Sequence, residues 1–214
     1  MNFEVLTEGE SDVPVVREVL SRRFGLLEGG DFRIHPHRGK GRLPVNAMAR
    51  PDPANRTLLH QLPAKLRGYA HLDRTYCVLV LVDADNDDCR ELKRSLVNVY
   101  KALDRKPPKV LFRIAVEETE SWLIADVDAV KAAYPKLDRR KLERIAPDSV
   151  VGAWERLAEA LGSRRGVQRG SKRAQYSGSD KAEWARQIAP HLNLNQPSSP
   201  SLTALVSGID KLIK

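Results

Sequence analysis

Acidic side chains follow three apolar runs of the sequence, at the point where each run ends. The runs cover residues 2–7, 75–82 and 110–116. If each run forms a strand of one parallel sheet, the acidic groups meet at the edge where open sheets bind their ligands. Carboxylate oxygens are the ligands that Mg²⁺ prefers in proteins. The sequence therefore predicts a site for Mg²⁺ (or Mn²⁺) built from these acidic side chains: Glu8, Asp83, Asp85, Asp87, Glu117 and Glu120.

Carboxylates placed so close together need a counter-charge. Two of them about 5 Å apart repel each other by roughly 3 kcal/mol at an effective dielectric of about 20. Their pKa values rise unless a cation neutralises them. Plainer roles stay open for some of these residues: Asp87 or Asp88 fits the N-cap of the following helix, and Asp83 and Asp85 fit a turn. The glutamates after residue 116 also fit a helix N-terminus, where each contributes only ~0.3–1 kcal/mol.

The elements that would position these groups alternate between strand and helix patterns. Strands are predicted at 2–7, 32–37, 76–82 and 110–116. The run TYCVLVLV at 75–82 is apolar almost throughout, as expected for a central strand buried on both faces. The alternation predicts an α/β fold with a mainly parallel four-stranded sheet flanked by helices. These helices are expected at 11–24, 58–69, 89–103 and from the EETESW segment to about Tyr134.

The pattern changes after residue 137. Only helical patterns occur there, at 148–162, 179–191 and 201–213, with joints rich in Gly, Ser and Pro between them. We therefore divide the chain into an α/β core at 1–137 and a helical C-terminal extension at 138–214. The extension is expected to pack on the core, and a separate small domain is the alternative.

The charge balance favours an anionic partner. The chain has 36 Lys and Arg against 28 Asp and Glu, which gives a net charge of +8 and a pI of about 9.6. Such a balance favours a polyanion without choosing between DNA, RNA and a membrane surface. Basic clusters are often only solvated surface. As contacts for nucleic acid the sequence offers two clusters: Arg38, Lys40 and Arg42, and Arg164, Arg165, Arg169, Lys172 and Arg173.

Other patterns argue against several functions. His35 and His37 face one side of a predicted strand, and without a third ligand they favour a structural role over zinc. No GxxxxGKS/T motif is present, which argues against ATP hydrolysis by this chain. No apolar run reaches the length of a membrane helix, so no membrane association is expected. Two cysteines without metal-ligand spacing, and no export signal, favour a reduced, cytoplasmic protein.

Two segments resemble the motifs of a known superfamily. LTEGESD at 6–12 resembles the first TOPRIM motif, and VLVLVDADND at 78–87 resembles the second. The whole chain further resembles a family of small, stand-alone bacterial TOPRIM-like proteins of unknown function, some encoded beside ATPases in phage-defence settings. GKGRL at 39–43, RIAVEETESWLIAD at 113–126 and IAPHL at 188–192 would be the other shared parts.

The resemblance implies roles for particular residues. A Rossmann-like TOPRIM core would use Glu8 as general acid/base or metal ligand, and Asp83 and Asp85 to hold magnesium, with Asp87 as a third candidate. In OLD-type nucleases, which carry TOPRIM domains, further glutamates and a lysine complete a two-metal site. Glu117, Glu118 or Glu120 could match those glutamates, and Lys181 could match the catalytic lysine or be a solvated lysine at a helix start.

Spacing suggests which of these glutamates act together. Glu117 and Glu120 are three residues apart, so on a helix they would point together towards a second metal. Glu118 would then point elsewhere or cap the helix.

These observations favour a Mg²⁺-dependent nuclease that hydrolyses DNA or RNA, as the effector subunit of a bacterial defence system. The first alternative is a non-catalytic regulatory subunit of an ATPase partner encoded nearby, binding metal or nucleic acid. The second is a phosphohydrolase of the haloacid-dehalogenase (HAD) type, which also uses strand-Asp-x-Asp but normally on its first strand. The sequence leaves open whether the chain forms an oligomer.

Overall fold

The computed structural model describes residues 1–149, 152–162 and 178–214. One sheet contains the strands, and each neighbouring pair is parallel. Their order across the sheet is β2-β1-β3-β4. The predicted α/β fold with a parallel four-stranded sheet is thus confirmed, at strand positions close to those expected: β1 (Asn2–Thr7), β2 (Phe32–Pro36), β3 (Tyr76–Asp83) and β4 (Val110–Ala115).

The strand β3 is buried on both faces, as its apolar sequence predicts. Successive side chains of a strand point to opposite faces. Val78, Val80 and Val82 therefore join one hydrophobic cluster, and Leu79 and Leu81 join another on the opposite face. Each of these five side chains exposes at most 1% of its surface.

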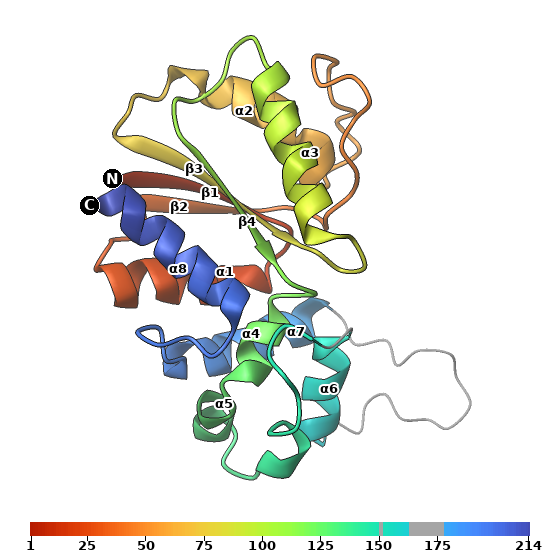
Figure 1. The fold of residues 1–214 in the computed structure, drawn as a ribbon, viewed down its shortest axis with the longest axis vertical. Coiled ribbons are helices and arrows are strands. Elements are labelled where there is room, and N and C mark those ends of the chain that lie inside the picture. The colour runs from red at the N-terminus through yellow and green to blue at the C-terminus, as the bar shows by residue number, and fades with distance from the viewer. Residues whose placement is uncertain (150–151, 163–177) are drawn as a thin grey trace.

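Helices cover both faces of the sheet (Figure 1). On one face lie α2 (Leu58–Gly68), with the short η2 (Tyr69–His71) after it, and α3 (Cys89–Ala102). On the other face lies α1 (Asp12–Glu18), which continues as the π-helical turn η1 (Val19–Arg23), together with α8 (Pro200–Ile213). The chain thus forms a three-layer arrangement around the parallel sheet.

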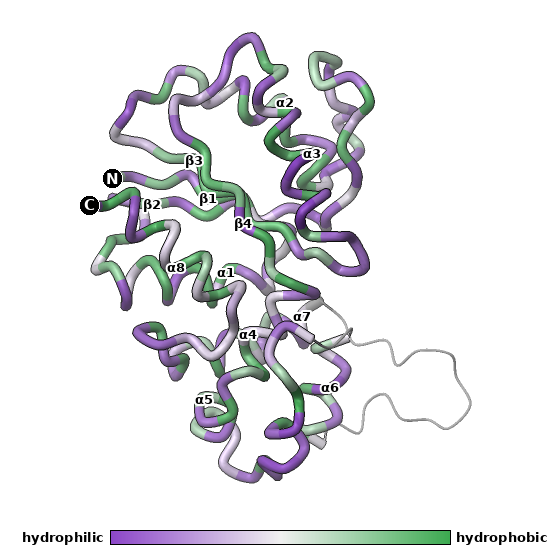
Figure 2. Tube along the Cα trace, in the orientation of Figure 1, coloured by the Kyte–Doolittle hydropathy of each residue, from purple (hydrophilic) through white to green (hydrophobic). Residues whose placement is uncertain are grey.

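The remaining helices form a group beyond the carboxyl end of β4 (Figure 1). They share hydrophobic contacts with α1 and with the sheet, because Leu157, Trp184 and Ile188 lie in the same cluster as Phe3 and Val15. Figure 2 shows hydrophobic residues running along β3 and β4 into this group. Its members are α4 (Glu120–Ala125), α5 (Val127–Ala133), η3 (Arg139–Lys141), α6 (Ala153–Ala160), α7 (Gly178–Ile188) and η5 (Ala189–His191).

Two predicted helices differ from the observed ones. The helix expected to continue to about Tyr134 breaks at Asp126, whose carboxylate accepts the Ala129 N–H and so caps a new helix, α5. The helix expected from residue 148 begins only at Ala153. Asp148 has a φ of +56°, and its carboxylate accepts hydrogen bonds from Ser199 and Ser201 at the start of α8. None of the helices in these described ranges is long and apolar enough to cross a membrane.

Candidate active site

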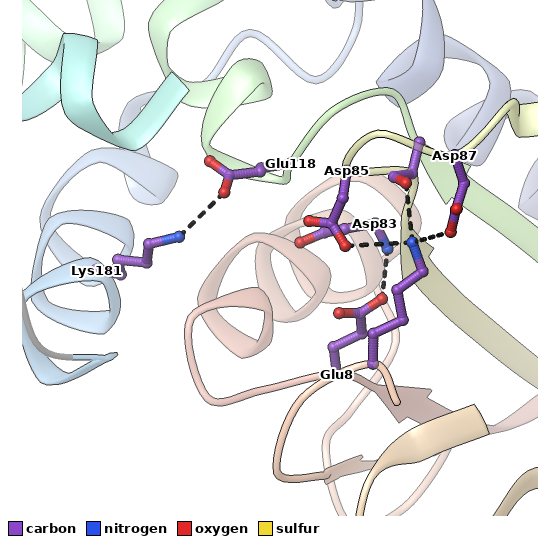
Figure 3. A network of polar contacts seen from close by, with 8 residues as sticks. Glu8, Asp83, Asp85, Asp87, Glu118 and Lys181 are labelled. Carbon is purple, nitrogen blue, oxygen red and sulfur yellow. Dashed lines mark hydrogen bonds and ion pairs between the residues drawn. The ribbon is translucent and has the colours of Figure 1, made fainter. Parts of the chain in front are cut away.

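The strands β1 and β3 lie side by side, but the chain leaves them in opposite directions. β1 connects through α1 to β2 on one side, and β3 connects through α3 to β4 on the other. In open α/β sheets, ligands bind outside the carboxyl ends of the strands at such a switch point. Glu8 follows β1 and Asp83 ends β3, so the two acidic motifs meet at this position (Figure 3).

Glu8 contacts the second acidic motif directly. Its Oε1 atom accepts the backbone N–H of Asp83 at 2.8 Å. Burial, together with the nearby charges of Asp12 and Asp85, raises the pKa of Glu8 to about 8, although that hydrogen bond and Lys40 act in the opposite direction. Glu8 can therefore gain or lose a proton near neutral pH, which is the property a general acid or base needs.

Asp12, at the start of the helix expected at 11–24, is a further member of the cluster. It exposes 2% of its surface, accepts the Gly9 N–H at 3.0 Å and accepts the Thr119 hydroxyl at 2.8 Å. Burial raises its pKa, although both hydrogen bonds oppose the change. Asp12 therefore joins the turn after β1 to the start of α4. Its place in the first motif, as an Asp that opens a helix, was the available signal.

Asp83 lies between the charges of the other acidic groups. Burial, followed by the charges of Asp12, Glu8 and Glu120, raises the pKa of Asp83 well above its usual range. Carboxylates from the turn after β1 and from α1, β3 and α4 thus repel one another here, as the sequence predicts for a site that attracts cations.

Lys40 lies against the carboxylates that follow β3. Its Nζ atom is 2.7 Å from Asp87 Oδ2 and 3.2 Å from Asp85 Oδ2, and it donates to the Ala84 carbonyl oxygen at 2.8 Å. Burial disfavours the charged form, but these two carboxylates outweigh it and raise the pKa of Lys40. Lys40 is among the residues predicted to bind nucleic acid, and the structure places its ammonium group on the acidic motif.

The loop that carries Lys40 requires glycine at the following position. Gly41 has a φ of +68°, and a Cβ atom there would lie 2.0 Å from Thr57 Oγ1. Any larger residue would clash with the Thr57 side chain at the start of α2. Asp88 has the role of a cap, since its carboxylate accepts the N–H groups of Arg90 and Glu91 at the start of α3.

Lys181 on α7 lies against two glutamates that follow β4 (Figure 3 shows the pair with Glu118). Its Nζ atom is 3.4 Å from Glu118 Oε1, 3.7 Å from Glu120 Oε1 and 5.1 Å from the centre of the Trp154 ring. Burial opposes the charge of Lys181, but Glu120 and Glu118 raise its pKa. The helical extension thus contributes a cation to the acidic edge of the core.

The expected pairing of Glu117 with Glu120 on one helix face is wrong. The helix α4 begins at Glu120, and Glu117 has a φ of +67° that places it outside the helix. The Glu117 carbonyl oxygen instead accepts the Asp85 N–H at 2.8 Å, which ties the loop after β4 to the loop after β3. Glu118, which was expected to point elsewhere or to cap the helix, is the residue that faces Lys181 together with Glu120.

The two glutamates beside Lys181 differ in their surroundings. Burial raises the pKa of Glu118 to about 7, with Lys181 opposing the rise. Glu120 exposes 2% of its surface, and burial raises its pKa as well. Its Oε1 atom has no hydrogen-bond partner among the residues that the structure describes. This oxygen is therefore a buried acceptor that a further cation or donor could satisfy.

Comparison with known protein families identifies the family of this chain. The model of the family described as "Domain of unknown function (DUF4276)" matches residues 7–210.

The chain belongs to the DUF4276 family.

No curated protein and no solved structure matches it. The DUF4276 match extends from the first acidic motif into α8 and therefore includes Glu8, Asp83 and Lys181.

The basic residues that were predicted to contact nucleic acid do not lie together in one site. Arg42 and Lys40 line a pocket of about 580 Å³ together with Asp85, Asp87 and the start of α3. Arg38 is exposed and lines a separate pocket at the end of β2. The other predicted contacts lie outside the described residues: Arg164, Arg165, Arg169, Lys172 and Arg173.

Proposed function

We propose that this chain is a divalent-metal-dependent nuclease that hydrolyses phosphodiester bonds of DNA or RNA with Mg²⁺ or Mn²⁺. The observation that carries the proposal is the contact of Glu8 with Asp83 at the switch point between β1 and β3. It joins the two acidic motifs in one cluster of mutually repelling carboxylates. A divalent cation would relieve this repulsion, and a phosphate group would complete its ligands.

The donor set fits a hard cation in its chemistry. Over the described ranges, the side chains form no ready-made group of three or more His, Cys, Asp or Glu ligands. Mg²⁺ does not need one, because it is commonly held by one or two carboxylates together with water and substrate phosphates. Asp83 and Asp85 would hold the ion, with Glu8 or Asp87 beside them. The bound ion would polarise the phosphate and lower the pKa of bound water.

The lysines of the site support the same chemistry. Lys40 neutralises Asp85 and Asp87, and Lys181 neutralises Glu118 and Glu120. A metal ion entering either group would release an ammonium group at the same edge, where it could bind a phosphate oxygen. Glu8, with a pKa of about 8, would accept or donate the proton during hydrolysis.

A non-catalytic role is the second candidate, and the lysine contacts also favour it. If Lys40 stays on Asp85 and Asp87, the acidic motif is already neutralised and the basic residues alone would bind nucleic acid. The chain would then act as a nucleic-acid-binding regulatory subunit of an ATPase. In either case the resemblance to TOPRIM-like proteins suggests a role in bacterial defence.

The test is cleavage of single- and double-stranded DNA and RNA, by the chain alone and with any ATPase that is encoded beside its gene. Activity should require Mg²⁺ or Mn²⁺ and stop in a chelator. Glu8→Gln and Asp83→Asn should each lower the rate by about 10²-fold or more in variants that remain folded under the assay conditions. Glu91→Gln is the matched control, because Glu91 lines the same pocket as Asp85 but pairs with Arg94 on the surface of α3.

Two results would contradict the nuclease. Cleavage that continues in the chelator would exclude a metal-dependent reaction. No cleavage of any of these substrates, combined with metal-independent binding of nucleic acid, would leave the regulatory subunit as the function.

A further inference from the structure

A second pocket lies beside the carboxylate cluster, at the end of β2. It has a volume of about 380 Å³, and its walls are basic or neutral. Within the described part of the chain no carboxylate lines it. We call it the basic pocket and define it by its lining residues: Pro36, His37, Arg38, Pro53, Arg56, Gln61 and Lys65.

The cations of the basic pocket have no counter-charge among the residues that the structure describes. Arg38, Arg56 and Lys65 form no ion pair with any other residue of the described ranges. The backbone N–H of Arg38 donates to the Arg56 carbonyl oxygen at 3.1 Å, so the two residues lie side by side. Burial lowers the pKa of Lys65, and no carboxylate offsets it. Positive groups held together without a partner are stabilised by a bound anion.

His37 and Gln61 are the neutral polar side chains that line the basic pocket. The Nδ1–H group of His37 donates to the Thr7 carbonyl oxygen at 2.8 Å, which fixes the ring. Its Nε2 atom is buried and has no hydrogen-bond partner in the described part of the chain. The side-chain amide of Gln61 is already used, since it donates to the carbonyl oxygens of Asp52 and Asn55. A ligand in the basic pocket would therefore meet its three cations: Arg38, Arg56 and Lys65.

We propose that the basic pocket binds a phosphate dianion. Arginine side chains bind phosphate oxygens through paired N–H groups, and a lysine adds a point charge. An internal phosphodiester carries a single negative charge, whereas a free or terminal phosphate carries about −1.5 to −2 at pH 7. Three uncompensated cations match the larger charge.

The basic pocket lies close to Glu8 of the carboxylate cluster. The backbone N–H of His37 donates to the Thr7 carbonyl oxygen, and the backbone N–H of Gly39 donates to the Glu8 carbonyl oxygen. A phosphate in the basic pocket would thus lie next to Glu8 along the sheet edge. Its source would be a free phosphate or the 5′ or 3′ terminal phosphate of a strand. This inference goes beyond the proposed function and does not depend on cleavage.

The test measures binding in a chelator, so that a failure of the nuclease proposal cannot affect it. Inorganic phosphate is titrated by calorimetry, and an oligonucleotide is compared with a 5′ phosphate, with a 3′ phosphate and with neither. Arg56→Gln and Lys65→Gln should each weaken phosphate-dependent binding by about tenfold or more, since a hydrogen bond to a charged group is lost. Arg74→Gln, at an exposed position before β3, is the control with the same change in charge.

The source of the phosphate is identified by the ligand whose binding the two variants lose: inorganic phosphate, the 5′-phosphorylated oligonucleotide or the 3′-phosphorylated one. Melting temperatures measured without phosphate show that the variants are folded. Two outcomes would overturn the inference: a wild-type chain that shows no phosphate-dependent binding in any arm, and binding that the two pocket variants retain to the same degree as Arg74→Gln.

Discussion

The raised pKa of Glu8 makes the stability of this protein depend on pH in a defined direction. The carboxylate has an ordinary pKa of 4.5 when exposed, and burial with the neighbouring charges of Asp12 and Asp85 raises it to about 8 in the folded chain. The unfolded chain therefore releases this proton at lower pH than the folded chain does. Between these two pKa values the folded state binds more protons, so its stability falls as the pH rises.

The magnitude follows from the two pKa values. Each pH unit between 4.5 and about 8 costs about 1.4 kcal/mol of stability, so the whole interval amounts to on the order of 5 kcal/mol. At pH 7 the cost is about 3 kcal/mol, because most of the interval has been passed. For a chain of 214 residues this corresponds to a Tm lower by about 6–12 °C.

Glu8→Gln removes the titrating group and keeps the contact. The amide oxygen of glutamine can still accept the Asp83 N–H, but it does not have to be protonated. We expect the variant to be more stable than the wild type by about 3 kcal/mol at pH 7 and by nearly nothing at pH 4. The free energy of unfolding is measured by urea denaturation at several pH values without divalent metal.

The control for this prediction is Glu10→Gln, which makes the same change at an exposed position two residues away. It should leave the wild-type curve unchanged. If the Glu8→Gln curve runs parallel to the wild-type curve from acid to alkaline pH, the carboxylate is not held protonated and the reasoning is refuted.

Other predictions concern the lysine pair, the cap and the core. Lys181→Met removes the cation beside Glu118 and Glu120, so the free energy of unfolding should fall. The loss should be larger at pH 8 than at pH 6, because Glu118, with a pKa of about 7, carries its negative charge mainly at the higher pH. Asp88→Ala should cost about 1 kcal/mol and lower the Tm by about 2–4 °C, because it removes the acceptor of two N–H groups of α3. Leu79→Ala should cost about 2–5 kcal/mol in urea denaturation, because Leu79 is fully buried in β3.

Each of these predictions has a control variant or a result that would contradict it. A Lys181→Met variant that loses the same stability at both pH values would mean that the ammonium group does not control the glutamates. Asp88→Asn keeps an acceptor at the cap and should retain most of the stability that Asp88→Ala loses. Leu79→Met, which nearly conserves volume, should cost less than Leu79→Ala, and equal losses would argue against a closely packed position.

The sequence by itself determined the sheet and the place of the acidic motifs. A continuous apolar run such as residues 76–82 can be buried on both faces only inside a covered sheet, and strands that alternate with helices must run in parallel. Because parallel strands end at one edge, Glu8 and Asp83 had to lie near each other. These conclusions depend on local patterns of apolar residues, which is why they could be drawn without the structure.

Tertiary structure alone decided which charged groups meet. Lys181 contacts Glu118 only because α7 packs against α1 and α4, and no local pattern encodes a contact between residues 63 positions apart. Lys40 reaches Asp85 because Gly41 lets its loop approach Thr57. The positive φ of Glu117 places that residue before the helix, so Glu118 takes the place expected for Glu117. Such contacts depend on how helices pack and where loops turn, and hydrophobic periodicity specifies neither.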